Sequence, residues 1–442
     1  MKSIPELRTR IGELTSAIES QKRALRDLEN QRSKVQSELN SRVDPMARIP
    51  FEIVSDIFLH CVSNIPRPDS RTAPLVLLNI CRLWRTIAVS TPFLWAEICM
   101  DSTPFPRGAK FAKLCRDWID RARTISLSFS LRGSLARRIE LLMNKHAPQV
   151  QNLELFVRDT TDLLRLGVPG LFPSLMKLTV GADETSPVEV DFSPGQCIGL
   201  LRAAPALLEC DFDDVFCADD IFPPGPVVTH TSLRVLRLGN PQSRAFEGYH
   251  GNSAFILQYV TLPSLQSLDI ADFDITPEVF ISFLMRSRPP LTCLRMVLPN
   301  TIWEPGTIIE YFQLTPNLTD VELYFTPNDD SDEENGAEPF RPFLEVLNTG
   351  TDLLQRLSNI TLWALFWEVG DYETIIKVLT ARRTSLRSFR LYFPPENYDA
   401  APPGLARNVI VALRQFTEDG IHVHVGPRQH NCLDRNLVAE NQ

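Results

Sequence analysis

A short apolar tag recurs through most of the chain and constrains its fold more than any other feature. The pattern is Leu-x-x-Leu-x-Leu, in which other apolar residues replace leucine at some positions. The tags begin at Val150, Leu175, Leu207, Leu233, Leu265, Leu291, Leu318, Leu357 and Leu386, at intervals of 25 to 39 residues. Because alternate residues of a strand face the same side, each tag predicts a short strand with one buried face.

Helix-like stretches such as residues 278–288, 307–312 and 372–383 lie between the tags. A strand followed by a helix, repeated in this way, is typical of a leucine-rich-repeat solenoid. The repeats are irregular, and the Asn or Cys expected three residues after the last leucine is absent. We therefore expect an irregular leucine-rich-repeat-like α/β solenoid over residues 101–426, with a non-repeat α/β domain as the alternative.

An acidic loop and two histidines are the remaining polar features of this region. The loop, residues 327–339, has six carboxylates between Asp329 and Glu338 but lacks the frame of a calcium loop, so we expect a solvated insertion. His422 and His424 share a face of the expected last strand, 421–425, and two histidines without a third ligand are more often surface residues than a metal site. Residues 427–442 are expected to form a flexible tail.

The side chains between and after the last leucines of each tag point away from the core and are candidates for binding. Tyr324, Trp363 and Tyr392 occupy equivalent positions on successive expected strands, with Arg390 beside them. Rings on adjacent strands can stack into one column, and these residue types dominate binding hot spots. We therefore predict that these four residues bind a protein target. The alternative is that the column is covered or belongs to the core.

Residues 6–40 carry an uninterrupted heptad pattern. Its apolar positions are Leu7, Ile11, Leu14, Ile18, Leu25, Leu28, Val35 and Leu39, and Gln21 and Arg32 fill the two remaining positions. Such a pattern predicts a coiled-coil helix, assigned to residues 1–44. Its apolar stripe either packs on the body of the same chain or pairs with a second copy, which would give a homodimer through residues 6–40.

Residues 45–100 are expected to form three short helices. Pro50, Pro74 and Pro92 each suit the first turn of a helix. The second helix is expected to run from Pro74 to about Val89, and the third to hold Trp95 and Ile98.

The first of these helices, residues 51–63, is apolar on more than one face. Phe51, Val54 and Phe58 form one stripe, which is expected to enter the core of the domain, and Ile53 and Ile57 form another. A helix that is apolar on two faces must bury both, so this small domain indicates a docking module.

The segment 45–100 resembles an F-box in its Ile49-Pro50 pair, in Ile53 and Ile57, in the run from Leu78 through Cys81 and Trp84 to Ala88, and in Pro92 to Trp95. With a coiled-coil helix directly before it, the chain is similar to the F-box-like proteins expanded in mushroom-forming fungi. The resemblance implies docking on the Skp-type adaptor of a cullin–RING ubiquitin ligase. It assigns docking to Ile49, Pro50, Ile53, Ile57 and Leu78, and the packing core to Cys81, Trp84 and Trp95. The alternative is a helical subdomain that only caps the rest of the chain.

Composition and missing motifs narrow the function further. The net charge of −9 and the absence of a Lys/Arg cluster disfavour nucleic-acid binding. No apolar run spans a membrane and no secretory signal is present, and nine scattered cysteines without Cys-x-x-Cys indicate the cytoplasm or nucleus. No nucleophile elbow, phosphate-binding loop or zinc-protease motif occurs.

We therefore expect no enzymatic activity and no cofactor or metal. The expected function is that of a substrate-recognition subunit of a ubiquitin ligase. The alternatives are a structural scaffold without ligase association and an unrecognised hydrolase.

Overall fold

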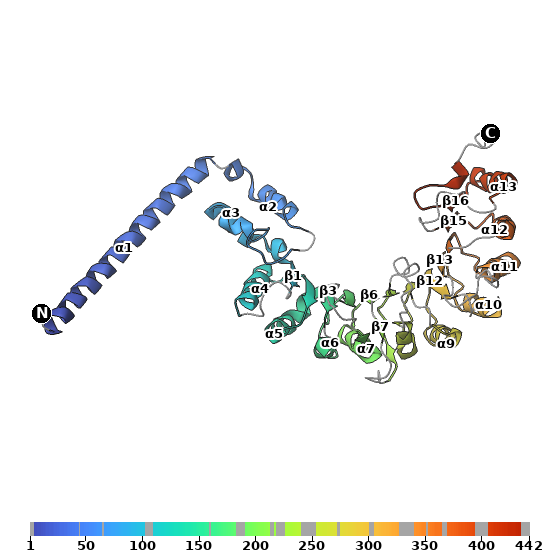
Figure 1. The fold of residues 1–442 in the computed structure, drawn as a ribbon, viewed down its shortest axis with the longest axis horizontal. Coiled ribbons are helices and arrows are strands. Elements are labelled where there is room, and N and C mark those ends of the chain that lie inside the picture. The colour runs from blue at the N-terminus through green and yellow to red at the C-terminus, as the bar shows by residue number, and fades with distance from the viewer. Residues whose placement is uncertain are drawn as a thin grey trace. The chain divides into compact units, whose positions relative to one another are not determined.

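The computed structural model describes residues 4–43, 45–63, 66–101, 109–158, 161–182, 191–212, 216–217, 226–239, 253–271, 275–299, 305–326, 340–350, 352–364, 369–393 and 405–434. The chain divides into two units (Figure 1). The first comprises Met1–Met100 with Lys110–Ser126, and the second Asp101–Ala109 with Leu127–Gln442.

The first unit begins with the 40-residue helix α1 (Ile4–Val43), as the heptad pattern predicts. Ion pairs between residues three or four apart, such as Arg10 with Glu13 and Lys22 with Glu19, support the helix on its charged faces. Its apolar stripe is not buried: exposed fractions of the side chains run from 48% at Leu7 to 71% at Ile4. The helix forms as predicted, and its stripe lies in solvent.

Short helices follow α1. They are the 3-10 helix η1 (Pro45–Arg48), α2 (Phe51–His60), the 3-10 helix η2 (Val76–Asn79), α3 (Arg82–Ser90) and the 3-10 helix η3 (Pro92–Trp95). The rings of Phe58 and Trp84 lie 5.0 Å apart, the hydroxyls of Ser55 and Thr91 are 3.1 Å apart, and the indole N–H of Trp95 donates to the carbonyl of Ala88. These contacts pack α2, α3 and η3 together.

Three details differ from the sequence-based expectation. The helix expected from Pro74 to Val89 is divided into η2 and α3, because Cys81 adopts an extended conformation and its Sγ accepts the N–H of Trp84 as the N-cap of α3. Ile98 lies not in a third helix but in strand β1 (Glu97–Asp101). Phe51, expected in the core with Val54 and Phe58, is exposed.

Helix α4 (Ala109–Ala122) packs with the first unit rather than with the region that follows residue 100. The indole N–H of Trp118 donates to the carbonyl of Glu97, and its ring meets that of Trp95 edge-on at 5.2 Å. The guanidinium of Arg121 lies 4.5 Å above the Trp95 ring. These contacts around Trp95 explain why the first unit extends past the predicted boundary at residue 100.

The second unit contains a long parallel sheet whose strands follow chain order. They are β2 (Leu127–Gly133), β3 (Val150–Val157), β4 (Lys177–Ala182), β6 (Glu209–Phe212), β9 (Val235–Leu238), β11 (Ser267–Ile270), β12 (Cys293–Pro299), β13 (Asp320–Thr326), β14 (Asn359–Ala364), β15 (Ser388–Tyr392) and β16 (His422–Gly426). Two short parallel pairs join β5 (Asp191–Phe192) to β7 (Phe216–Cys217) and β8 (Val228–Thr229) to β10 (Val260–Thr261). The predicted order of an α region followed by an α/β region is confirmed.

Helices connect the strands and lie on one side of the sheet (Figure 1). They are α5 (Arg137–His146), α6 (Thr161–Leu166), α7 (Pro194–Ala203), α9 (Pro277–Ser287), α10 (Pro305–Leu314), α11 (Arg341–Thr349), α12 (Val369–Ala381) and α13 (Arg407–Glu418), with the 3-10 helices η4 (Ala147–Gln149) and η5 (Ser253–Tyr259). The three apolar residues of all nine tags are buried, with at most 5% exposure. No helix among the described residues is long and apolar enough to cross a bilayer.

The chain after β16 packs against the sheet as far as residue 434. The side chain of Asn431 bonds to the backbone of Val423 and Val425, and Cys432 and Leu433 in the 3-10 helix η7 (Cys432–Asp434) are buried. The predicted flexible tail therefore cannot begin at residue 427. Residues 435–442 and the acidic loop 327–339 lie outside the described residues.

Candidate functional site on the polar face of the sheet

The strand register aligns one charged row across the face of the sheet opposite the helices. Its central members are Asp211, Arg237, Asp269, Arg295 and Glu322, each paired with the next on the adjacent strand. The sign of the charge alternates along the row. Opposite charges on adjacent strands stabilise a sheet, so the row couples β6 to β13.

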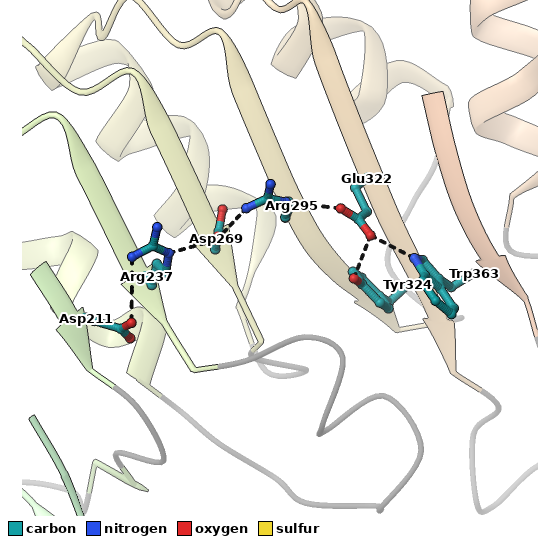
Figure 2. A network of polar contacts seen from close by, with 7 residues as sticks. All are labelled: Asp211, Arg237, Asp269, Arg295, Glu322, Tyr324 and Trp363. Carbon is teal, nitrogen blue, oxygen red and sulfur yellow. Dashed lines mark hydrogen bonds and ion pairs between the residues drawn. The ribbon is translucent and has the colours of Figure 1, made fainter. Parts of the chain in front are cut away.

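Ion pairs connect these five side chains into one network (Figure 2). Arg237 lies between Asp211, with an N–O distance of 3.7 Å, and Asp269, at 3.4 Å. Arg295 lies between Asp269 and Glu322, with N–O distances of 3.0 Å to both. Each arginine thus has a carboxylate on both sides, and the three carboxylates leave the network with one net negative charge.

Asp269 is the buried centre of this network. Burial raises the pKa of its carboxyl above the ordinary value, while the positive charges of Arg295 and Arg237 oppose the shift. Its Oδ2 accepts from Arg295, whereas its Oδ1 has no hydrogen-bond partner among the described residues. The desolvation of this carboxylate explains why two arginines are needed beside it.

An aromatic row runs next to the charged row, two residues further along each strand. Tyr324 and Trp363 are register partners, and their rings stack with 5.5 Å between centroids and 8° between planes. The ring centroid of Tyr392, on the next strand, lies 4.5 Å from that of Trp363. The hydroxyl of Tyr324 and the indole N–H of Trp363 both donate to Oε1 of Glu322, at 2.7 and 2.8 Å (Figure 2). Glu322 therefore joins the aromatic row to the charged network.

The predicted column of rings exists, but two of its three rings are buried. Tyr324 is 1% exposed and Trp363 is 9% exposed, and both belong to a buried cluster with Ala271 and Val297. Their assignment as target contacts is therefore corrected, since stacking and the bonds to Glu322 make them part of the structural interior. Tyr392 and Arg390 are half-buried and reach the surface.

Arg390 differs from the other arginines of the charged row. Its register partners are Thr361 on β14 and His424 on β16, and neither carries a negative charge. Together with Tyr392, whose ring lies 5.0 Å from that of His424, it forms a cationic and aromatic end to the polar face. Arg390, Tyr392 and His424 are called the C-terminal patch below.

The two histidines of β16 do not form a metal site with other described residues, among which no group of three or more metal-ligating side chains occurs. Burial lowers the pKa of His424, and the charges of His422 and Arg390 lower it further. A hydrogen bond to the carbonyl of Pro427 acts in the opposite direction and raises this pKa. Burial therefore favours the neutral form of this imidazole, and Arg390 supplies a positive charge to the C-terminal patch.

Sequence reasoning placed the charged residues on the outward face but did not identify their network. The available signal was the alternation of sign at one tag position, from Asp211 to Glu322, over five successive strands. The tags are 26 to 32 residues apart in this region, so the alternation of charge is visible only after the repeats are aligned.

A second surface, on the first unit, contains the residues that the resemblance assigns to docking. Ile53 is 50% exposed and Pro50 is exposed, while Ile49, Ile57 and Leu78 are half-buried. Of the expected core residues, Trp95 is buried and Trp84 and Cys81 are half-buried. The name docking surface is used below for Ile49, Pro50, Ile53, Ile57 and Leu78.

Comparison of the chain with protein-family models and with curated proteins finds no match. The function must therefore be inferred from the residues and from the geometry of these two surfaces.

Proposed function

We propose that the protein is a non-catalytic substrate-recognition subunit of a Skp/cullin/F-box-type ubiquitin ligase. Residues 45–100 act as the F-box and dock on the Skp-type adaptor, and the leucine-rich-repeat-like solenoid of the second unit captures a protein target. The protein contributes no chemistry of its own. It acts by proximity, because holding both partners on one chain raises the effective concentration of the target near the ligase.

The observation that carries this proposal is the division of α2 into two apolar faces. Val54 and Phe58 are fully buried inside the unit, whereas Ile53 is half exposed on the same ten-residue helix. Ile80 and Phe51, close to the docking surface in sequence, are exposed as well. A small helical unit that leaves large apolar side chains in solvent is typical of a protein-interaction module.

The C-terminal patch is the proposed contact for the target. Each charge from Asp211 to Glu322 lies in an ion pair within the sheet, and the row carries one net negative charge. Arg390 has uncharged neighbours in its row and lies beside the half-buried ring of Tyr392. Tyr324 and Trp363 support this ring from the interior, and the positive charge of Arg390 favours an acidic group on the target.

Adaptor docking is tested with the double substitution Ile53→Asp and Ile57→Asp in the full chain. The two charges should abolish binding to a purified Skp-type adaptor in a pull-down, because a buried contact cannot solvate them. The matched control is Leu141→Asp with Met285→Asp, two exposed apolar residues on helices of the second unit, which should bind as the wild type does. Thermal melting checks that both variants fold.

Two results would contradict the docking proposal. If the wild-type chain fails to bind the adaptor, the protein is instead a scaffold without ligase association. If the double variant binds at the wild-type level, the docking surface is assigned to the wrong residues.

Target capture is tested separately by affinity capture with mass spectrometry. Arg390→Glu with Tyr392→Ala should lose captured proteins that the wild type retains, while adaptor binding stays unchanged. Equal capture by both chains would remove the C-terminal patch as the target contact.

A further inference from the structure

The apolar stripe of α1 is exposed along the helix, from Ile4 to Leu39. We propose that α1 pairs with α1 of a second copy of this chain as a parallel, in-register, two-stranded coiled coil. This pairing involves α1 alone and does not depend on the proposed function. At about 1.5 Å per residue, the helix offers a seam about 60 Å long.

The residue types along the seam favour two strands. With Ile4 as position a of a heptad, the a positions are Ile4, Ile11, Ile18, Leu25, Arg32 and Leu39, and the d positions are Leu7, Leu14, Gln21, Leu28, Val35 and Arg42. The first three heptads therefore have isoleucine at every a position. Isoleucine at a with leucine at d packs best in a parallel dimer.

Two of the three polar seam residues, Gln21 and Arg32, define the register, and the third, Arg42, occupies the last d position of the helix. In the parallel, in-register pair, Gln21 meets Gln21 and Arg32 meets Arg32 of the second copy, and every apolar residue meets an identical one. In the antiparallel pair of greatest overlap, Gln21 would face Leu25 and Arg32 would face Leu14. Each polar residue would then desolvate against an apolar one, so the parallel arrangement retains more apolar layers.

The positions that flank the seam permit this pairing. In a parallel pair, Arg10 lies near Thr15 of the second copy, Ala17 near Lys22, and Ala24 near Glu29. None of these contacts brings like charges together, and Arg10 and Lys22 keep their own ion pairs with Glu13 and Glu19. The flanks therefore add no repulsion between the two helices.

The contacts of α1 with the rest of its unit leave the seam free. The guanidinium of Arg82 on α3 binds the hydroxyl of Ser33, and the guanidinium of Arg48 donates to the carbonyl of Arg42. Ser33 is a heptad b position, outside the seam. Val35 and Leu39 remain exposed next to this contact, so the apolar seam continues as far as Leu39.

Self-association is tested by sedimentation of the full chain at tens of micromolar. The wild type should sediment as a dimer, and Leu14→Asp should weaken the dimer by about 100-fold or more, because two charges would face each other in the seam. The control Ser16→Asp adds the same charge on the outer side of the same turn and should leave the dimer unchanged. Arg32→Leu should tighten the dimer by about tenfold, because it removes a polar layer.

A wild-type chain that stays monomeric at this concentration would overturn the proposal, as would a Leu14→Asp chain that dimerises like the wild type. Circular dichroism distinguishes a lost contact from a lost helix. Adaptor binding is measured on the same samples, so failure of the dimer and failure of the proposed function are recorded independently.

Orientation is tested by disulfide formation in a glutathione buffer, with the wild-type chain as the blank for its own cysteines. Leu14→Cys should form a covalent dimer with itself. A mixture of Leu14→Cys and Arg32→Cys chains should form each homodimer rather than the mixed one. Preferential formation of the mixed dimer would establish the antiparallel pair and overturn the proposed orientation.

Discussion

Two regions of this protein carry periodic leucines, and they use them in opposite ways. In the parallel sheet, the three apolar residues of every tag are buried, with at most 5% exposure. In α1, the apolar residues of the heptads are at least 48% exposed. The residue types are nearly the same, so the difference comes from what lies next to each segment.

Each strand of the sheet has a neighbouring strand that the chain itself supplies 26 to 39 residues later in most cases. The next repeat therefore helps to bury the apolar face of the previous one. Charged side chains on adjacent strands also form ion pairs, as Arg237 and Arg295 do with Asp269. α1 has no such repeat beside it. Its stripe is exposed, and we propose a second copy of this chain as its partner. This contrast leads to the following predictions.

The largest effect is expected when a tag leucine is shortened. Leu268→Ala should lower the free energy of unfolding by about 4 kcal/mol, because the side chain is fully buried on β11 and leaves a cavity. Leu25→Ala on the exposed stripe of α1 should change it by less than about 0.5 kcal/mol. Denaturant unfolding measures both changes, at a concentration where sedimentation shows the chain to be monomeric. Equal losses of free energy of unfolding would contradict the contrast between the two regions.

The aromatic row tests whether side chains on the polar face of the sheet also stabilise the second unit. Trp363→Ala should destabilise the second unit by about 3 kcal/mol, because it removes a stacked ring and leaves Glu322 without one donor. Trp363→Phe keeps a ring and should cost about 1 kcal/mol. If Trp363→Ala melts like the wild type but loses captured targets, the ring is a target contact after all.

Arg382 tests internal pairing on the helix side of the sheet. Its guanidinium donates to the carbonyl of Leu347 in the last turn of α11 and to those of Gly350, Leu353 and Leu354 just after the helix, at 2.9 to 3.1 Å. Arg382→Ala should cost about 3 kcal/mol, because these carbonyls lose their donors. The neighbouring Arg383, in a solvent-exposed ion pair with Asp419, provides the control.

Arg383→Ala should cost less than about 1 kcal/mol, as exposed ion pairs do. Chemical denaturation of the two variants side by side gives the comparison. Similar losses would show that Arg382 does not stabilise the end of α11 through these bonds.

The smallest effect concerns the pH dependence of stability. Because burial raises the pKa of Asp269 above its ordinary value of 3.8, the folded chain binds this proton more tightly than the unfolded chain does. The resulting stabilisation is fully present below the ordinary pKa and is lost as the pH rises through the raised pKa. Asp269→Asn should remove this decrease from the pH profile of unfolding.

Asp211→Asn, at the more exposed end of the network, controls for the loss of one negative charge. The prediction is contradicted if the free energy of unfolding of the wild type rises with pH over this range and Asp269→Asn gives the same profile. Asp269 would then not hold its proton more tightly in the folded chain.

Local periodicity explains what could be predicted from the sequence. The heptads predicted α1, and the tags predicted strands such as β11 and β12 with the correct buried face. The alternation at 421–425 predicted β16. In each case the signal lies within a few turns or one strand, where side-chain direction follows from backbone geometry alone.

The remaining features depend on contacts between distant residues. Alternation shows that Trp363 faces away from the helices, but its burial depends on Tyr324 and Glu322, 39 and 41 residues away in sequence. The assignment of α4 to the first unit likewise depends on contacts of Trp118 and Arg121 with Trp95 and Glu97. Patterns within one segment carry no information on either.

The central claim is that the first unit binds a partner through apolar residues it leaves exposed, while the second unit keeps its leucines for its own core. Hydrogen exchange of the full chain with and without a purified Skp-type adaptor tests this most directly. We expect new protection over residues 49–60 and 76–90, with the strands of the sheet unchanged. Unchanged exchange over those two segments, or protection confined to the second unit, would contradict it.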